Sequence, residues 1–527
     1  DLPVSAFKGR EDGTFPAGTT QFEKRGVAVY VPEWDVETCI QCNLCAYACP
    51  HACIRPFLLN EDEKRNAPEG TLTKPAKPEK QFNGLEYRIQ VSVLDCTGCE
   101  NCVDVCPSDS LTMKILDTQM DEVERWDYLH HKVGYKKDVV DVTKNVKNSQ
   151  FAQALFEFSG ACAGCGETPY IKNLTQLFGE KMIIANATGC SSIYGGSAPS
   201  TPFTSNLITG RGPAWANSLF EDNAEYGFGM SIAIVKLRER IKTKLFDNLD
   251  LLNPETKLAY QAWIDTFDDT LKNDEPSKQL IAALKKENAT IAKEVLQLEQ
   301  YISKKSIWII GGDGWAYDIG YGGLDHVLAS GKNINILVLD TEVYSNTGGQ
   351  ASKASQIAQV AKFAASGKDV RKKDLGAISM TYGYIYVAQV AMGANVNQFF
   401  KVMKEAEAYN GPSIIIAYSP CIAHGIKSGM GSTQSEEKFA VEAGYWILYR
   451  YNPDLEKQGK APFVLESKEP DWEKYKEFLN HEIRFSQLLT AFPDRAKILF
   501  EKALNEAQWR WKYYKRLEQS YKVEVNV

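Results

Sequence analysis

The sequence predicts an α/β protein in which a mostly parallel sheet follows a smaller, cysteine-rich α+β domain. Three observations support this fold class. Short apolar runs flanked by glycine alternate with helix-length segments from about residue 150 onward. A cysteine spacing occurs twice between residues 39 and 106. The chain has 527 residues, which is too long for one ordinary hydrophobic core and predicts at least two domains.

The composition excludes several classes of protein. Hydrophobic residues make up 44% and charged residues 24% of the chain, as in ordinary globular proteins. The net charge is −7, without a polybasic tract, so nucleic acid is not expected as a partner. No run of about 18 apolar residues predicts a membrane span, and no secretion leader is recognisable. We therefore expect a cytoplasmic protein that does not bind membranes.

The first elements form a connector and a repeated domain. Residues 1–34 are rich in Gly and Pro and lead into a strand-like segment at 26–32. Residues 35–149 contain two similar halves, DVETCIQCNLCAYACP and LDCTGCENCVDVCP, separated by a charged, Pro-rich insertion at 60–80. Such an internal repeat predicts two equivalent sites in one small domain.

Each half has the spacing C-x2-C-x2-C-x3-C-P, which is typical of [4Fe–4S] ligands. The fourth cysteine of each half ligates the cluster of the other half in two-cluster ferredoxins, so ligation is expected to cross over. We assign one cluster to Cys39, Cys42, Cys45 and Cys106, and the other to Cys96, Cys99, Cys102 and Cys49.

Zinc is the alternative for this domain, because C-x2-C pairs also bind zinc. The third cysteine at the same step and the Cys-Pro pairs favour iron–sulfur. Cys53 matches no ligand position and is expected to be a small buried residue.

The remaining chain predicts an α/β domain over 150–450. Its buried strands are expected at 182–189, 306–314, 334–342 and 413–421. Residues 246–305 are rich in Lys, Glu, Leu and Ala and predict a helical insertion of two helices, and 451–527 predict a C-terminal helical extension. Packing on the same chain or on a partner subunit is the expected role of that extension.

A Gly-Asp-Gly at the end of one predicted strand suggests a diphosphate–metal site. Glycine lets the backbone approach a diphosphate closely, and the Asp313 carboxylate is a hard ligand for Mg²⁺. Thr341 follows the next strand, 28 residues after Asp313, and one helix plus one strand would bring the two side by side. The alternative is a simple turn, since such tripeptides are common in turns.

Four further cysteines remain outside the repeat. Cys162 and Cys165 form a C-x2-C pair, whereas Cys190 and Cys421 each follow a predicted strand. Four thiols suffice for one more cluster, which would lie near the Gly-Asp-Gly site because strand ends carry function in such sheets. Zinc or unrelated thiols are the alternatives, and His424 could serve a zinc site.

The order of these motifs resembles the pyruvate:ferredoxin oxidoreductase family, in its C-terminal half. The likeness covers about residues 20–450 and includes CAGCGET, ATGCSSIYGG, GGDGWAYDIG, DTEVYSNTGGQ and SPCIAHG. It implies a thiamine-diphosphate-binding α/β domain preceded by a ferredoxin-like α+β domain with two [4Fe–4S] clusters. Thr341 departs from thiamine-diphosphate enzymes, which usually have Asn there.

The resemblance also implies roles for individual residues. Asp313, Thr341 and the carbonyl of Val343 would hold Mg²⁺, and Cys162, Cys165, Cys190 and Cys421 would hold a third [4Fe–4S] cluster. Gly312, Asp313, Gly314 and Trp315 would cradle the diphosphate, Glu167 would contact the thiamine, Cys190 would border it, and Asn346 would face the substrate. The alternative for Glu167 is a carboxylate that stabilises a helix start.

The implied reaction is oxidative decarboxylation of pyruvate with coenzyme A to acetyl-CoA and CO2. Electrons would pass singly through three [4Fe–4S] clusters to ferredoxin or flavodoxin. Two alternatives are an oxidoreductase for another 2-oxo acid, such as 2-oxoglutarate or indolepyruvate, and a non-catalytic electron-transfer subunit. We expect these residues to be completed by N-terminal domains of the same enzyme or by a separate chain, and the resemblance implies a homodimer.

Overall fold

The computed structural model describes residues 3–197 and 200–524. The chain folds into two compact units. The first comprises residues 1–180 and 192–213, and the second comprises 181–191 and 214–527. Each unit has its own hydrophobic core.

The first unit contains two small antiparallel sheets. β1 (Tyr30–Trp34) pairs with β5 (Leu111–Ile115), and β2 (Ile54–Leu59) pairs with β4 (Glu86–Val91), which also pairs with β3 (Lys74–Pro75). Two short helices, α1 (Leu44–Ala48) and α4 (Asn101–Asp104), occupy matching positions in the two halves of the repeat. The other helices are α2 (Glu61–Arg65), α3 (Glu79–Phe82), α5 (Glu122–Tyr128), α6 (Val146–Ser149) and α7 (Thr168–Phe178).

The second unit is built on an eight-stranded sheet with the order β13-β12-β10-β11-β9-β8-β6-β7. Six strands run parallel: β6 (Met182–Ala187), β7 (Ala214–Ser218), β8 (Ser306–Gly312), β9 (Ile334–Asp340), β10 (Tyr386–Val390) and β11 (Pro412–Tyr418). β12 (Tyr449–Tyr451) and β13 (Phe463–Leu465) extend one edge in antiparallel pairs. The predicted α/β class with a mostly parallel sheet is confirmed.

The four predicted strands are β6, β8, β9 and β11, which lie next to one another in the sheet. All residues of β9 and β11 are buried, which explains their continuous apolar sequences. The prediction missed four strands of this sheet, namely β7, β10, β12 and β13. β12 and β13 have three residues each, and the edge strand β7 is at most half-buried and lacks an apolar run.

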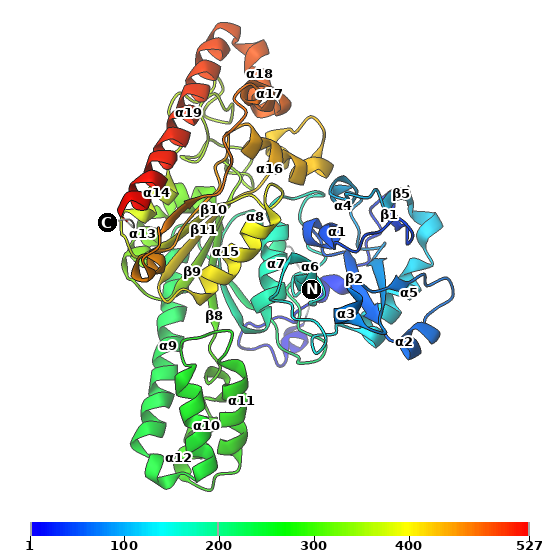
Figure 1. Ribbon diagram of the computed structural model, residues 1–527, viewed down its shortest axis with the longest axis vertical. Coiled ribbons are helices and arrows are strands. Elements are labelled where there is room, and N and C mark those ends of the chain that lie inside the picture. Colours follow the sequence, from blue (N-terminus) through cyan, green and yellow to red (C-terminus); the bar gives the residue numbers. More distant parts are fainter. Residues whose placement is uncertain (1–2, 198–199, 525–527) are drawn as a thin grey trace. The chain divides into compact units, whose positions relative to one another are not determined.

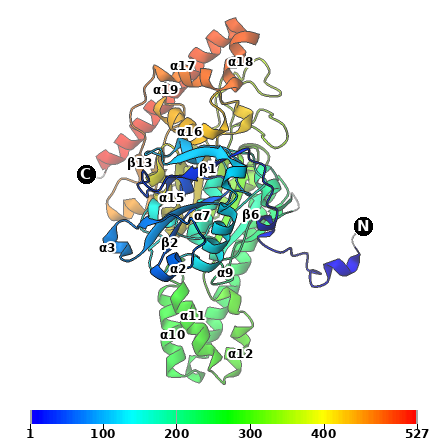
Figure 2. The ribbon, with the colours of Figure 1, turned by 90° about the vertical axis from the view of Figure 1, so that its right-hand side faces the viewer.

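A helical subdomain lies between β7 and β8 in the chain. It contains the end of α9 (Asn223–Asp247), then α10 (Pro254–Asp265), α11 (Asp274–Lys285) and α12 (Thr290–Leu296). These helices share a separate core around Trp263, and they extend away from the sheet in both views (Figures 1 and 2). Residues 246–305 thus hold three α-helices instead of the two expected.

The remaining helices connect the strands and follow them. They are α13 (Tyr321–Ala329), α14 (Leu375–Met380), α15 (Val396–Ala408), α16 (Thr433–Glu442), α17 (Lys474–His481), α18 (Ile483–Ala491) and α19 (Pro493–Glu524). The C-terminal segment also supplies β13, so it is not helical throughout. None of the described helices combines the length and apolarity needed to cross a membrane.

Candidate functional site

The two cysteine repeats share one backbone conformation. Gln41 and Asn43 have positive φ angles of 60° and 63°, and Gly98 and Glu100, at the matching positions, have 67° and 71°. The N–H groups of Gln41 and Gly98 each donate to the sulfur two residues earlier, at 3.4 Å. A side chain at Gly98 would come within 2.8 Å of a backbone oxygen, so only glycine fits there.

The fourth cysteine of each repeat also accepts a backbone N–H group. The N–H of Cys53 donates to Cys49 Sγ at 3.3 Å, and the N–H of Ser110 donates to Cys106 Sγ at 3.2 Å. Cys53 therefore occupies the position that Ser110 has in the other half. Its own thiol is buried and donates to the Asp95 carbonyl at 3.1 Å, which matches the expected small buried residue.

The eight thiols of the repeat gather as two sets of four. One cavity of the first unit is lined by Cys49, Cys96, Cys99 and Cys102. Burial and the nearby thiols of Cys99, Cys49 and Cys96 raise the pKa of Cys102 well above its usual value. In the other set, burial and the thiols of Cys42, Cys39 and Cys106 raise the pKa of Cys45 in the same way. The structure therefore brings each fourth cysteine beside the triplet of the opposite half.

Replacing Cys49 with Ser should remove the cluster of the opposite half. We expect a loss of about four iron atoms per chain, because Cys49 lines the cavity of Cys96, Cys99 and Cys102. Iron analysis and electron paramagnetic resonance of the anaerobically purified, reduced protein would measure this loss.

Cys106→Ser is the matched control, since it should remove the other cluster and leave a different spectrum. Two variants that lose the same cluster signal would contradict the crossed arrangement.

The loop that contains Cys162 and Cys165 packs against the domain of the two cysteine repeats, and both belong to the first unit. His51 is buried, and its ring nitrogens lie 3.1 Å from the Ser159 carbonyl oxygen and 3.2 Å from that of Cys162. Burial raises the pKa of the Cys99 thiol to about 11, and the nearby backbone N–H of Gly164 opposes this rise. The loop around Cys162 and Cys165 is therefore fixed next to the set that contains Cys99.

The carboxyl ends of four adjacent parallel strands carry the other predicted residues. β6, β8, β9 and β11 are neighbours in that order, and they are followed by Cys190, Asp313, Thr341 and Cys421, respectively. Cys190 Sγ lies 3.3 Å from the hydroxyl of Ser345, in the loop after β9. The third cysteine set is thus divided: Cys162 and Cys165 belong to the first unit, and Cys190 and Cys421 to the second.

Three oxygen atoms converge between β8 and β9. The Thr341 hydroxyl donates to Asp313 Oδ1 at 3.0 Å and lies 2.9 Å from the Val343 carbonyl oxygen. Burial and the neighbouring Asp340 raise the pKa of Asp313 to about 8. These hard donors suit Mg²⁺. No three His, Cys, Asp or Glu side chains among the described residues meet as ligands of one ion. The set between β8 and β9 differs from such a group because it has one carboxylate, one hydroxyl and one backbone carbonyl.

The backbone beside these oxygen atoms packs closely. A side chain at Gly314 would come within 2.5 Å of the Tyr344 ring, so this helix start and the loop after β9 approach closely only with glycine. Trp315 is fully buried, and its indole nitrogen has no hydrogen-bond partner among the described residues. Such a donor is available for an anionic oxygen. Asn346, in the same loop as Tyr344, is exposed.

Glu167 lies at the start of α7 in the first unit. It is buried, and its carboxyl accepts a hydrogen bond from the Tyr194 hydroxyl at 3.0 Å. Burial raises its pKa to about 7. The side chain makes no capping hydrogen bond to the helix, which weakens the helix-start alternative.

A buried ionic network behind the oxygen triad escaped the sequence prediction. Lys372 pairs with Asp340 at 2.7 Å and with Glu342 at 3.0 Å. Arg484 pairs with Glu342 at 2.9 Å and with Glu482 at 2.7 Å. Asp340 was the only visible signal, because it ends a predicted strand next to Thr341.

Two further side chains contact the oxygen triad directly, and the sequence prediction missed both contacts. Ser352 donates to Asp313 at 2.6 Å, and His424 contacts the Thr341 carbonyl at 2.7 Å.

Family comparisons identify both cofactor-binding parts. Residues 38–110 match a 4Fe-4S dicluster domain, and residues 291–417 match the C-terminal TPP binding domain of thiamine pyrophosphate enzymes. Residues 1–28 match a domain of unknown function. The fold and these matches define a chain with a ferredoxin-type iron–sulfur domain followed by a thiamine-diphosphate-binding α/β domain.

The curated relatives confirm the predicted resemblance to pyruvate:ferredoxin oxidoreductases. The chain is 54% identical to the pyruvate:ferredoxin oxidoreductase of Moorella thermoacetica and 52% identical to the pyruvate-flavodoxin oxidoreductase of Klebsiella pneumoniae, in both cases over 98% of this chain and 44% of the relative. It is also 47% identical to the pyruvate dehydrogenase [NADP(+)] of Euglena gracilis, over 98% of this chain and 28% of that protein. The chain therefore spans less than half the length of these relatives.

Proposed function

We propose that this chain forms the cofactor-binding and electron-transfer part of a pyruvate:ferredoxin oxidoreductase. The proposed reaction is oxidative decarboxylation of pyruvate with coenzyme A to acetyl-CoA and CO2. The observation that carries the proposal is the convergence of Asp313, Thr341 and the Val343 carbonyl at strand ends, with Cys190 and Cys421 following the two flanking strands.

The residues present fit thiamine diphosphate and Mg²⁺. Asp313, Thr341 and Val343 would hold the ion through oxygen atoms. Gly312, Gly314 and the Trp315 indole would border the diphosphate. When bound, thiamine diphosphate supplies the nucleophilic carbon for the 2-oxo carbonyl and stores the electrons that remain after CO2 leaves.

The protein would position the cofactor and the substrate. The Glu167 carboxyl, fixed by the Tyr194 hydroxyl, would contact the thiamine ring. Asn346 would face the substrate from the loop after β9, where its exposure leaves the amide free to donate to a carboxylate. Cys190 would both ligate a cluster and border the cofactor.

Electrons would leave through three [4Fe–4S] clusters. Cys162, Cys165, Cys190 and Cys421 would ligate the cluster nearest to the thiamine. Within the first unit, the His51 ring contacts the Cys162 carbonyl and Gly164 lies near the Cys99 thiol, so the set of Cys99 would receive the electrons next. Ferredoxin or flavodoxin would be the acceptor, as two of the relatives' names suggest.

The wider organisation belongs to the same proposal. We assign 1–34 to a connector, 35–149 to the two-cluster domain, 150–450 to the thiamine domain with its helical insertion at 246–305, and 451–527 to a C-terminal extension. A cytoplasmic homodimer, completed by further domains of the enzyme, would carry out the reaction.

Composition analysis of the anaerobically purified protein tests the proposal. We expect about 12 iron atoms per chain, from three clusters of four, and one thiamine diphosphate with one Mg²⁺. In the complete enzyme, pyruvate with coenzyme A should reduce a dye acceptor, whereas 2-oxoglutarate should not. About eight iron atoms, or zinc, would show that the third set is misassigned. A protein that never retains or binds thiamine diphosphate would instead be an electron carrier.

A further inference from the structure

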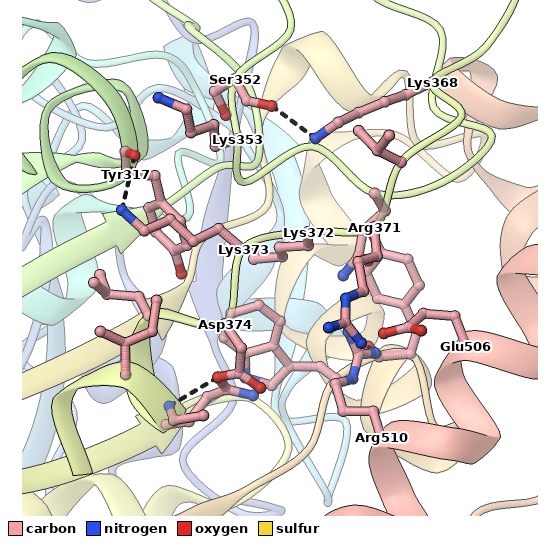
Figure 3. A pocket seen from close by; sticks show the side chains of 18 of the residues that line it. Tyr317, Ser352, Lys353, Lys368, Arg371, Lys372, Lys373, Asp374, Glu506 and Arg510 are labelled. Atoms are coloured by element: carbon pink, nitrogen blue, oxygen red, sulfur yellow. Dashed lines mark hydrogen bonds between the residues drawn. The ribbon is translucent and has the colours of Figure 1, made fainter. Parts of the chain in front are cut away.

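A cavity of the second unit lies beside the proposed thiamine site, because its lining residue Ser352 donates a hydrogen bond to Asp313 at 2.6 Å. It has a volume of about 720 Å³ and lies between the segment from Ala351 to Ile378 and the helix α19 (Figure 3). Its lining includes none of the residues assigned above to Mg²⁺, diphosphate or substrate. A volume of this size suits a small-molecule ligand.

Basic side chains dominate this cavity. Six of them line it against three acidic ones, Asp318, Asp374 and Glu506. Two of the basic groups already have carboxylate partners: Lys372 pairs with Asp340 and Glu342, and Lys353 pairs with Asp318 at 3.3 Å. The other four basic residues are Lys368, Arg371, Lys373 and Arg510.

Three of these cations contact carbonyl oxygens or aromatic rings. Lys368 donates to the carbonyls of Ser352 and Ser355 at 2.9 and 2.6 Å. Lys373 lies 2.8 Å from the centre of the Tyr321 ring, and Arg371 lies 4.9 Å from that of Trp509. These contacts leave positive charge available at the cavity.

Arg510 shows most directly that the cavity lacks negative charge. One of its terminal nitrogens donates to the Tyr445 carbonyl at 2.7 Å, while its Nε is buried without a partner among the described residues. Its carboxylate neighbour is Glu506, whose pKa is raised by burial although Arg510 and Arg371 lower it. One carboxylate thus faces two guanidinium groups, and a donor remains unsatisfied.

The lowered pKa values of two lysines of the cavity, Lys368 and Lys373, also favour an anion there. Burial and the charge of Lys372 lower the pKa of Lys368 to about 8. Burial and the charge of Lys353 lower the pKa of Lys373 to about 8. An anion in the cavity would relieve this repulsion and restore the charged form of both amines.

The walls of the cavity also offer aromatic surface. Trp446, Trp509 and Tyr513 line it together with Leu375 and Ile378. Planar aromatic side chains provide stacking surface for a ligand ring. A nucleoside diphosphate combines such a ring with several negative charges near neutral pH, and four cations of the lining remain against Asp374 and Glu506 once Lys353 and Lys372 are counted with their partners.

We propose that this cavity is a binding site for a nucleoside diphosphate. The phosphates would contact Arg371, Lys368, Lys373 and Arg510, and the base would lie against the face of the Tyr513 ring that Trp509 does not cover. The cavity shares no lining residue with the proposed Mg²⁺, diphosphate and substrate contacts, so the inference does not rest on the proposed function, although Ser352 connects the cavity wall to Asp313.

Calorimetric titration with ADP tests the site. The protein should first be saturated with thiamine diphosphate and Mg²⁺, so that the diphosphate cannot enter the other site. We expect ADP to bind with 1:1 stoichiometry, AMP to bind more weakly, and adenosine to bind at least about 100-fold more weakly because it lacks the charge-assisted bonds. Inorganic diphosphate that binds as tightly as ADP would refute the role of the aromatic wall.

Single substitutions then locate the site. Arg371→Gln and Arg510→Gln should each weaken ADP binding about 10-fold. Arg516→Gln, which alters an exposed arginine on the same helix α19, should leave the affinity unchanged. Unchanged circular dichroism and cluster absorption would show that the variants are folded. Absence of ADP binding, or equal binding by the wild type and both cavity variants, would overturn the proposal.

Discussion

Replacing Asp313 with Ala should abolish Mg²⁺-dependent binding of thiamine diphosphate. Asp313 supplies the carboxylate of the oxygen triad, and it accepts hydrogen bonds from Thr341 at 3.0 Å and from Ser352 at 2.6 Å. Loss of a supporting group around a metal site typically costs 10- to 100-fold in affinity, so loss of this ligand should weaken binding by at least about 100-fold. Fluorescence titration of the cofactor-free protein would measure the change.

The iron–sulfur clusters give an internal control for this variant. Their proposed ligands include neither Asp313 nor its contacts, so iron content and cluster spectra should stay at wild-type values. Asp325→Asn is a matched substitution, because Asp325 lies on α13 in the same unit and accepts a hydrogen bond from Tyr382 at 2.9 Å. Normal cofactor binding by the Asp313 variant would refute its metal role.

Replacing Arg484 with Met should destabilise the second unit by about 3–5 kcal/mol, the usual cost of leaving a buried charge unpaired. Arg484 is 2% exposed, and its partners Glu342 and Glu482 are fully buried. It also donates to the hydroxyls of Tyr418 and Tyr445, at 3.1 and 3.2 Å. Urea unfolding of the anaerobic protein, followed by tryptophan fluorescence, would measure the lost free energy.

A second substitution separates the charge effect from the loss of packing. Loss of Arg484 leaves Glu482 without its arginine partner, whereas Glu342 keeps Lys372. Adding Glu482→Gln removes that uncompensated carboxylate, so the double variant should be more stable than the single one. Arg516→Met, at an exposed position of α19, should change stability by less than about 0.5 kcal/mol. A loss of similar size at both arginines would contradict the importance of the buried network.

Much of the fold could be predicted because its elements have local signals. The strands β6, β8, β9 and β11 lie in the sheet interior, where both faces are covered and the sequence is therefore continuously apolar. The short strands β12 and β13 have only three residues each. They form because a neighbouring edge offers unpaired backbone groups, and no local pattern reports such a neighbour.

In the candidate site, too, some residues could be found from local sequence motifs, whereas others became visible in the folded structure. Spacing indicated the two cysteine repeats and placed Asp313 near Thr341, whereas the family resemblance supplied the third cysteine set and the metal role of the oxygen atoms. Ser352, His424 and Lys372 had no such pattern. They reach Asp313, Thr341 and Asp340 through long connections, which only the folded chain brings together.

The sequence by itself determined the class of fold, the two cysteine repeats and the chemical type of the oxygen triad. The tertiary structure decided which strand ends are neighbours and which charges are buried together. It also revealed the basic cavity beside α19, whose residues come from segments more than 100 positions apart. The physical reason is that propensity and ligand spacing are encoded locally, whereas burial and electrostatic pairing depend on contacts between distant segments.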